Sequence, residues 1–543
     1  MIDFQHKLPA LNIEERHNGT YNNMEWGFPS VLTTTDSKLG CFIRALRNSI
    51  KDESNVMFMD NKVLYCLKPW IRDHVHILKA AKHFEHELLS FYDFIVENQR
   101  EDGQFYELIK QYDDYHWKMV NEDCYKMYEE DNIALVRLEL EADIEYLVVE
   151  GAMYIYHVFG DNEWLKKTLP ALEKGIEYMV SSEKRFDKEH GLVKRNFTID
   201  TWDFTYKVNN AIDRRIHKDS PMSIMHGDNS GVYQAMNQLA WFNRRLGNEE
   251  KALYWEKKAE VLKENIFKYL WNGTHFIHQL HLNHSGADDK ENVRLSLSNT
   301  YDMNRGLMTT EQCRKVIEEY MRRKDTTEFF AEWFSIDPPY DCTDFAGYKP
   351  GRYVNGAISP FTAGELAKAA FNNGYEDYGW DIISRFMKLV ERDGVPFFLY
   401  DIDSKPQPEG GPSAWGSAAF LSAVDEGLAG IVDLDVNYNE MKFSPKFVVT
   451  HYEELRYITG YHINKTVIDV KFIVKENGMR YDLSTPSKRI DAHILLPKGK
   501  TCSKLLLNGK ETAFTLSTVG ESDYVDLTIE NNCENTLSFE ILF

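Results

Sequence analysis

Two aspartates flank a tryptophan in the segment Asn196–Tyr206. Asp200 and Asp203 stand on either side of Trp202. A carboxyl group packed among aromatic rings loses hydration, which raises its pKa and keeps it protonated near neutral pH as a general acid. The alternative is an aspartate that caps a turn in an aromatic loop. The segment is therefore a candidate for acid catalysis.

A second segment, Lys68–His76, places an aromatic ring beside a charged pair. Trp70, Arg72 and Asp73 come just before a predicted helix. The C–H face of a sugar stacks on an indole ring, and its hydroxyl groups bond to guanidinium and carboxylate groups. These residue types favour carbohydrate binding. The alternative is a helix cap with a structural bridge between the arginine and the aspartate.

Two further loops combine glycine and proline with polar side chains. In Tyr353–Phe361, Gly356 would let the backbone approach a ligand and Pro360 would start a helix. In Asp401–Gly416, Glu409 lies just before a helix, where its carboxylate could orient a water molecule. A plain helix-entry loop and a solvated turn residue are the alternative interpretations.

Four histidines follow each other at intervals of three: His275, His278, His281 and His284. On a strand these positions alternate between faces, so at most two point the same way. No cysteine or paired carboxylate completes a metal shell, so we predict neither a metal site nor a cofactor. The sequence also has no Walker loop, dinucleotide-binding glycine motif or G-x-S-x-G motif, and gives no support for nucleotide chemistry or serine hydrolysis.

Composition excludes several classes of protein and partner. The chain has 543 residues, 43% hydrophobic and 27% charged, which is typical of a globular protein and excludes long disorder. Its 63 basic and 85 acidic side chains give a net charge of −22, with no dense basic stripe. We therefore expect neither nucleic acid nor an anionic membrane as a partner.

The sequence predicts a soluble, cytoplasmic protein. No apolar run has the length of a membrane helix, and the first residues lack the apolar stretch of a signal peptide. Seven scattered cysteines, with no C-x-x-C pair, are typical of reduced thiols. The oligomeric state stays open.

Paired helices must position these loops. From about residue 70 to 430, apolar residues recur at steps of three and four. Phe159–Asn162, Gly247–Asn248 and Asn372–Gly374 divide three helical pairs, because glycine ends one helix and a short polar side chain begins the next. Repeated turns of this kind indicate a series of helical hairpins.

Long segments with the composition of strands and loops interrupt the series irregularly: 183–227, 271–300 and 326–356. A helical solenoid would keep a fixed repeat. A closed ring of hairpins, with long loops over one end, tolerates the irregularity better.

The composition changes after Ile431. Short β-rich runs such as Thr466–Val474 alternate with turn signals such as Asn477-Gly478 and Asn508-Gly509, which predict antiparallel hairpins. We therefore predict a mainly α chain with three parts. An irregular or β-containing lead-in covers residues 1–40, a helical catalytic domain 41–435, and a small antiparallel β-sandwich 436–543.

The stretch from Trp70 to Ile431 resembles the six-hairpin, or (α/α)6-barrel, glycoside hydrolases. Trp70-Ile-Arg-Asp73 resembles the early sugar-binding motif of debranching-type and glucosidase-type members. Thr201-Trp-Asp-Phe-Thr205 is similar to the Gly-Trp-Asp-Phe-Ser segment of the trehalase and processing glucosidase I branch, whose aspartate is the general acid. Here Asp203 takes that place.

Two later motifs follow in the family's order. Tyr353-Val-Asn-Gly-Ala-Ile-Ser-Pro360 resembles a Tyr-x-Asn-Gly-x-x-x-Pro loop common to several branches. Ser413-Ala-Trp-Gly-Ser-Ala-Ala419, followed by Glu426–Ile431 and a β-domain, is similar to the last barrel helix of the rhamnosidase-like branch. Four motifs in order imply an (α/α)6 helical toroid.

The resemblance implies a glycosidase with a carbohydrate substrate at the barrel mouth, and we expect it to be exo-acting. In its mechanism Asp203 protonates the leaving oxygen and Glu409 activates a water, with inversion because the two lie on separate loops. Reserve candidates for the base are Asp401, Asp403 and Glu332. The expected pocket lining is Trp70, Arg72, Asp73, Asp200, Trp202, Tyr353, Asn355 and Trp415. A polysaccharide lyase, a glycoside phosphorylase and a noncatalytic helical interaction module remain the alternatives.

Overall fold

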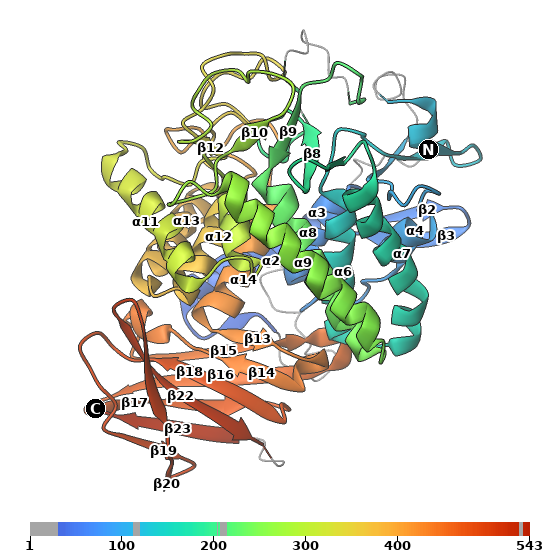
Figure 1. Cartoon of the computed structure of the whole chain (residues 1–543). Helices are drawn as coiled ribbons and strands as arrows, with labels where there is room; N and C mark the ends of the chain where they lie inside the picture. Colours follow the sequence, from blue (N-terminus) through green and yellow to red (C-terminus); the bar gives the residue numbers. More distant parts are fainter. Residues whose placement is uncertain (1–30, 112–119, 204, 207–213, 532–535) are drawn as a thin grey trace.

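The computed structural model describes residues 31–543 apart from 112–119, 204, 207–213 and 532–535. Within them, twelve α-helices are followed by a C-terminal part made mainly of sheets (Figure 1). The predicted helical region and C-terminal β region are both confirmed. Most of the lead-in expected over residues 1–40 lies outside the described residues.

The first predicted helical hairpin consists of α6 (Ile144–Phe159) and α7 (Asn162–Ser181). Gly160 ends α6 in the left-handed conformation, with φ 61°. The side chain of Asp161 then accepts hydrogen bonds from the backbone N–H groups of Glu163 and Trp164 and so caps α7. Both turn residues do what the sequence predicts of them.

The other two predicted hairpins are confirmed as well. Helices α8 (His226–Arg245) and α9 (Glu249–Leu270) are separated by Gly247, which has φ 80°. Helices α12 (Pro360–Asn372) and α13 (Glu376–Asp393) are separated by Gly374, also at φ 80°.

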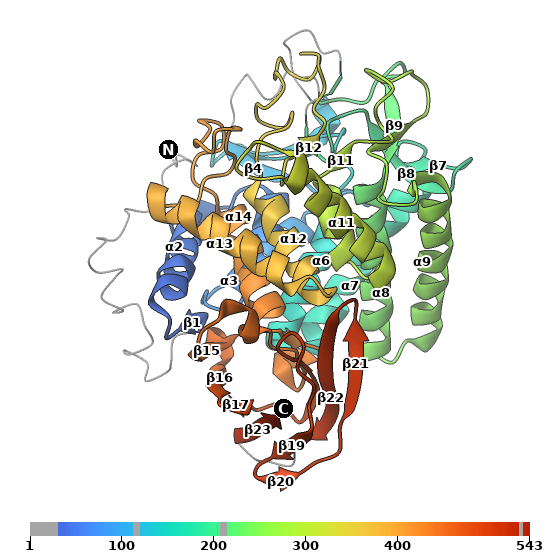
Figure 2. The same cartoon turned by 90° about the vertical axis from the view of Figure 1, so that its left-hand side faces the viewer.

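Six further helices complete the helical part: α2 (Ser37–Glu53), α3 (Ile71–Ala81), α4 (Ser90–Glu97), α10 (Ser298–Asn304), α11 (Thr310–Thr326) and α14 (Ala414–Ser422). Helices α3, α6, α8, α10, α12 and α14 each contact the next, and α14 contacts α3. Figure 2 shows α12, α13 and α14 beside α2 and α3. Close approach at one crossing depends on Gly364, where a Cβ atom would lie 2.6 Å from Ala419.

Long loops and short strands lie at the end of the helices away from the C-terminal sheets (Figure 1). A four-stranded sheet joins β7 (Phe186–Asp187), β8 (Leu192–Asn196), β9 (Met222–Met225) and β10 (Gln279–His281), and a pair joins β11 (Leu295–Ser296) to β12 (Ile336–Asp337). A hairpin of β2 (Asn55–Met59) and β3 (Lys62–Cys66) precedes α3, and β4 (Leu108–Gln111), β5 (Tyr125–Tyr128) and β6 (Ile133–Val136) form a three-stranded sheet.

The C-terminal part holds two sheets. The seven-stranded sheet has the order β1-β15-β16-β17-β23-β19-β20, and the five-stranded sheet has the order β13-β14-β18-β22-β21. Their strands are β13 (Ile431–Asp433), β14 (Glu440–Phe443), β15 (Glu454–Tyr461), β16 (Thr466–Lys475), β17 (Gly478–Ser484), β18 (Arg489–Leu495), β19 (Lys504–Leu507), β20 (Lys510–Glu511), β21 (Thr515–Val519), β22 (Ser522–Glu530) and β23 (Thr536–Leu542). The sheets pack face to face, because the ring of Phe443 lies 5.9 Å from Tyr481 and 5.7 Å from Phe539.

One feature of these sheets differs from the sequence prediction. Strands β14 and β18 pair in parallel, with Glu440 opposite Arg489, whereas a wholly antiparallel sandwich was expected. After β14 the chain forms β15, β16 and β17 of the seven-stranded sheet before it returns as β18. The connection between β14 and β18 is therefore not a hairpin. In addition β1 (Thr33–Thr34) joins the seven-stranded sheet, with Thr33 opposite Ile458.

The sheets are tied to the ends of the helices by buried polar contacts. The Tyr457 hydroxyl donates a hydrogen bond to Asp425 at 2.9 Å, and the Ser522 hydroxyl donates to Glu376 at 2.6 Å. None of the described helices combines the length and the apolar character that a bilayer span requires. Each described cysteine is a free thiol.

Candidate active site

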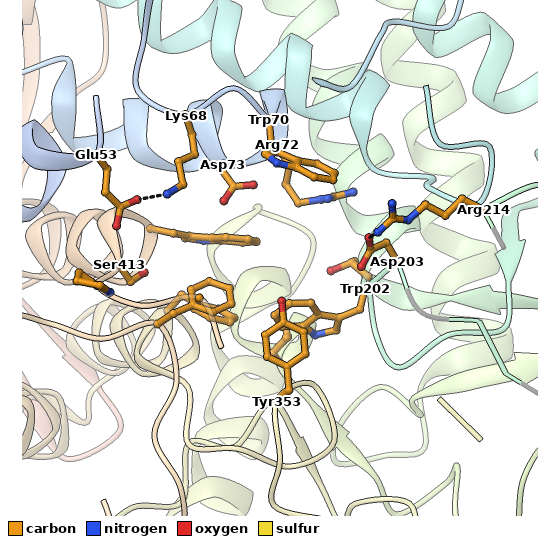
Figure 3. Close-up of a pocket in the computed structure, with 17 residues that line it drawn as sticks. Glu53, Lys68, Trp70, Arg72, Asp73, Trp202, Asp203, Arg214, Tyr353 and Ser413 are labelled. Carbon is orange, nitrogen blue, oxygen red and sulfur yellow. Dashed lines mark hydrogen bonds and ion pairs between the residues drawn. The ribbon is translucent and has the colours of Figure 1, made fainter. Parts of the chain in front are cut away.

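A pocket with a volume of about 340 Å³ opens among the loops that precede α3, α12 and α14 (Figure 3). Segment 201–203, Arg214, Leu297 and the last residue of α2 also contribute to its lining. The pocket therefore gathers residues from all four of the segments that the sequence analysis selected. It contains the expected acid, Asp203, and six of the expected lining residues: Trp70, Arg72, Asp73, Trp202, Tyr353 and Trp415.

One wall of the pocket is a continuous set of aromatic rings. The Trp202 ring lies 5.0 Å from Tyr353 and 5.8 Å from Phe398. Phe361 continues the wall, 5.2 Å from Phe398 and 4.8 Å from Trp415. Such a wall suits the apolar face of a sugar ring.

The opposite wall carries charge, and Arg72 is its most firmly held member. Its Nε lies 2.5 Å from one carboxylate oxygen of Asp143, and its Nη2 lies 2.8 Å from the other. The same Nη2 also donates to Glu141. Arg72 is 8% exposed. Since these buried carboxylates take most of its donors, Arg72 is fixed by the protein before any ligand arrives.

Asp73 projects into the pocket from the first turn of α3 (Figure 3). Burial raises the pKa of its carboxyl group to about 6, against the opposing charges of Lys68 and Arg72. A carboxyl group with such a pKa can exchange a proton with a ligand near neutral pH.

Asp203 faces the pocket from a separate loop and pairs with Arg214. The Arg214 Nη2 donates to the Asp203 carboxylate at 2.6 Å. Figure 3 shows this ion pair on one side of the pocket and a second pair, Glu53 with Lys68, on the other side. Asp73 lies between them. Two carboxyl groups, one from the first turn of α3 and one from a loop, thus reach one aromatic-walled cavity.

Glu409, the expected base, does not line the pocket. Its two carboxylate oxygens lie 2.9 and 3.0 Å from Nη2 of Arg352. The next residue, Gly410, does line it. Burial raises the pKa of the Tyr353 hydroxyl, and the negative charges of Asp203, Asp73 and Glu409 add to this shift. The charge of Glu409 therefore acts on a pocket residue, but its side chain is paired with Arg352 outside the pocket lining.

Asp200 and Asn355 were expected in the lining but lie beneath it, fully buried. The Asp200 carboxylate accepts hydrogen bonds from the hydroxyl and the backbone N–H of Ser298, at 2.6 and 3.1 Å. The Asn355 amide donates to the carbonyl groups of Tyr340 and Tyr348, at 2.9 and 3.1 Å. Both side chains use their polar atoms to hold the loops that carry Trp202 and Tyr353.

The three reserve carboxylates also lie outside the pocket lining. Glu332 is buried and pairs with Arg385 at 2.7 Å. Asp401 accepts backbone hydrogen bonds from Asp403 and Lys405, at 3.0 and 2.9 Å, and so forms a turn. Asp403 is exposed in that turn.

Sequence reasoning missed several lining residues, notably Glu53, Phe361, Phe398 and Arg214. Glu53 ends α2 and belongs to no motif, so no local signal could have indicated it. Phe361 is the last residue of one selected segment and Phe398 lies just before another, so both could have been found as aromatic residues of these loops.

The histidine series forms polar contacts under the loops. His278 pairs with Glu291 at 2.6 Å, and His281 contacts Ser223 at 3.0 Å. Across the part of the chain that the structure describes, no group of three His, Cys, Asp or Glu side chains is arranged to hold a metal ion.

The family model of the mannosylglycerate hydrolase MGH1-like glycoside hydrolase domain matches residues 68–405, which is more than half of the chain. The chain belongs to this glycoside hydrolase family. The match begins at Lys68 in the pocket and ends shortly before Glu409. No curated protein sequence matches this glycoside hydrolase.

Two solved rhamnosidase structures share the fold of this glycoside hydrolase at low sequence identity. The α-L-rhamnosidase from Dictyoglumus thermophilum has a TM-score of 0.59, with 11% identity over 94% of this chain and 51% of its own. The α-L-rhamnosidase from Streptomyces avermitilis, complexed with L-rhamnose, has a TM-score of 0.55, with 11% identity over 95% of this chain and 42% of its own. The mannosylglycerate hydrolase from Thermus thermophilus has a TM-score of 0.47, with 13% identity over 70% of this chain and 99% of its own. The chain spans about half the length of the two rhamnosidases.

Proposed function

We propose that the chain hydrolyses the bond between a terminal sugar and a small aglycone. The observation that carries this proposal is the convergence of Asp73, from the first turn of α3, and Asp203, from a separate loop, in one aromatic-walled pocket. Membership of a glycoside hydrolase family supports the reaction class. A noncatalytic interaction module would not require such a pocket.

The size of the pocket supports action on a chain end. Its volume of about 340 Å³ is at the lower end of the range for ligand pockets. A single sugar with a small aglycone suits this space better than the strand of a polymer. The family name makes mannosylglycerate the first substrate to test, with rhamnosides second.

The ring of helix contacts supports the finer description of the fold. We assign α3, α6, α8, α10, α12 and α14 as the six inner helices of an (α/α)6 barrel. Each contacts the next and the last contacts the first. The proposed division has this barrel in residues 41–435, the lead-in before it and the β-sandwich in 436–543.

In the proposed mechanism, Asp203 protonates the glycosidic oxygen, as the family resemblance implies. Asp73 deprotonates a water molecule that attacks the other face of the anomeric carbon. A base works best when its pKa lies near the working pH, and burial gives Asp73 a pKa of about 6. Attack by water from the face opposite the leaving group inverts the anomeric configuration.

One observation favours the reverse assignment of the two roles. Arg214 lies 2.6 Å from the Asp203 carboxylate, and an ion pair of this kind suits a base better than a proton donor. Glu409 is the third candidate, because its loop borders the pocket. The experiment must therefore separate the three carboxyl groups.

The test compares Asp203→Asn, Asp73→Asn and Glu409→Gln on two kinds of substrate, activated aryl glycosides and a glycoside with a poor leaving group. Each reaction is measured with and without azide. Loss of the acid leaves activated aryl substrates nearly unaffected and slows poor leaving groups about 10²- to 10⁴-fold. Loss of the base is rescued by azide, which yields a glycosyl azide. We expect the first pattern for Asp203→Asn and the second for Asp73→Asn. The opposite result exchanges their roles, azide rescue of Glu409→Gln makes Glu409 the base, and undiminished activity of all three variants refutes the proposal.

The stereochemical outcome provides a separate test. Proton NMR of the anomeric signal during the first minutes of reaction distinguishes the two possible products. A first-formed sugar with the configuration of the substrate would contradict the water-activating role and require a carboxylate nucleophile.

A further inference from the structure

The ion pair between Lys68 and Glu53 lies across the pocket from Asp203 (Figure 3). The Lys68 ammonium nitrogen is 2.6 Å from Glu53 Oε2. The Glu53 side chain is 4% exposed, whereas that of Lys68 is 32% exposed. Neither residue takes part in the acid–base chemistry proposed above. The pair therefore needs another explanation.

Glu53 is held in place by a second contact. Its Oε1 accepts a hydrogen bond from the backbone N–H of Ala414, the first residue of α14, at 3.0 Å. The carboxylate thus joins the last residue of α2 to the start of α14, and Lys68 is anchored to it. A polar group fixed in this way loses little entropy when it binds a ligand.

The pair presents a donor and an acceptor side by side. An ammonium group has three N–H donors, and each carboxylate oxygen accepts more than one hydrogen bond. Glu53 would repel an anionic ligand and Lys68 a cationic one, because the two opposite charges lie together. A neutral vicinal diol matches the pair, since one hydroxyl donates to the carboxylate while its neighbour accepts from the ammonium group.

The position of the pair indicates which hydroxyl groups it would meet. This step rests on the proposed function, which puts the anomeric carbon beside Asp73 and Asp203. In a pyranose ring C4 lies opposite C1, with C3 next to it. The sugar edge that carries O3 and O4 then faces Lys68 and Glu53, while the ring lies along the aromatic wall.

We propose that Glu53 and Lys68 bind the neighbouring hydroxyl groups at C3 and C4 of a terminal hexose. The pair thereby selects neutral sugars whose nonreducing end is free. A substituent on either oxygen would separate the sugar from the pair. Recognition of these two hydroxyls would restrict the enzyme to chain ends.

Sugar binding tests this inference without requiring hydrolysis. Trp70, Trp202 and Trp415 line the pocket, so bound sugar should change the tryptophan fluorescence. The probes are methyl α-D-mannopyranoside and methyl α-D-glucopyranoside with their 3-deoxy, 4-deoxy and 6-deoxy derivatives. For the better-bound parent, we expect loss of O3 or O4 to weaken binding about tenfold or more, since hydrogen bonds to charged groups are strong. Loss of O6 should have a smaller effect.

The variant Lys68→Met/Glu53→Gln removes both charges together, so that no unpaired charge is left buried. It should bind the parent and the 3-deoxy and 4-deoxy sugars with the same weakened affinity. The matched control is Lys324→Met/Asp381→Asn, which removes an ion pair of the same 2.6 Å length outside the pocket. The control should keep the full hydroxyl dependence, and thermal unfolding of both variants checks that they fold.

Three outcomes would overturn the inference: neither parent sugar binds, the 3-deoxy and 4-deoxy sugars bind as well as the parent, or the charge-free pocket variant still discriminates among them. Hydrolysis of aryl glycosides, measured in parallel, tests the proposed function separately. A protein that cleaves them yet shows no dependence on O3 or O4 keeps the proposed function and loses this inference. A protein that binds sugar through O3 and O4 yet cleaves nothing supports this inference and refutes the function.

Discussion

The imidazole ring of His76 lies flat against the indole ring of Trp415, with centroids 4.4 Å apart and planes 10° from parallel. His76 belongs to α3 and Trp415 to α14, so the contact joins two helices that both border the pocket. Burial lowers the pKa of His76 well below its usual value, and the charges of Lys79, Arg305 and Arg72 add to this effect. The imidazole of His76 therefore stays neutral, and it stabilises the position of the Trp415 ring by stacking against it.

Replacement of His76 should make Trp415 more mobile in the aromatic wall of the pocket. An aromatic pair contributes about 0.5–1.5 kcal/mol, so we expect His76→Ala to raise KM about 2- to 10-fold. Fluorescence anisotropy should report a more mobile Trp415. The control is His190→Ala, which removes a ring that packs on Tyr269 outside the pocket lining. An unchanged KM for His76→Ala would contradict the supporting role.

Asp73→Asn should stabilise the protein at neutral pH while it removes activity. The pKa of Asp73 is about 6 in the folded chain against a usual 3.8, so its contribution to stability is greatest below about pH 4 and falls as the pH rises to about 6. The amide cannot ionise and avoids this loss. Melting temperatures at pH 4 and pH 7 should differ between variant and wild type mainly at pH 7. A difference of equal size at both pH values would contradict the prediction.

Gly364→Ala should destabilise the contact between α12 and α14. The added Cβ would lie 2.6 Å from Ala419 and 2.8 Å from the backbone nitrogen of Phe420, so the helices must move apart. Overpacking of this kind costs about 1–3 kcal/mol in the free energy of unfolding. Gly40→Ala in α2 is the control, because its nearest atom would be 3.5 Å away. There the higher helix propensity of alanine should leave stability unchanged or raised. Urea unfolding curves for both variants provide the measurement.

Tyr457→Phe should weaken the attachment of the C-terminal sheets without changing KM. The substitution removes the hydrogen bond to Asp425, a carboxyl group whose pKa burial raises to about 7. An unsatisfied buried acceptor costs about 1–3 kcal/mol, which should appear as a lower melting temperature. Truncation near residue 436 should have the same effect in stronger form. A large change in KM for Tyr457→Phe would show that the sheets influence the pocket.

Local signals account for the parts of the fold that the sequence predicted well. Gly160 and Asp161 act on their own neighbours in the chain, so the hairpin between α6 and α7 could be placed to within a few residues. The parallel pairing of β14 with β18 depends on a long passage through another sheet, and no nearby residue encodes it.

The candidate site divides in the same way. Trp70, Asp73 and Asp203 were found because unusual residue types stand close together in the sequence. Glu53 was missed because only folding brings the end of α2 to the start of α14. Glu409 has the right type and a suitable loop, but Arg352 holds its side chain outside the pocket lining, a contact that the sequence could not reveal.

The pairing of β1 with β15 affects the order in which the molecule can be completed during synthesis. The backbone N–H of Arg456 bonds to the hydroxyl of Thr35, 421 positions earlier in the chain, and Ala414 reaches back 361 positions to Glu53. A chain still being translated therefore holds helix α2 for most of synthesis without the partners that fix either end of it. The pocket acquires Trp415 and the contact between Ala414 and Glu53 only when the final quarter of the chain emerges from the ribosome. The pairing of Thr33 with Ile458 forms at the same late stage. Until then the growing polypeptide lacks part of the pocket lining, and premature termination before this point yields a product without the complete pocket.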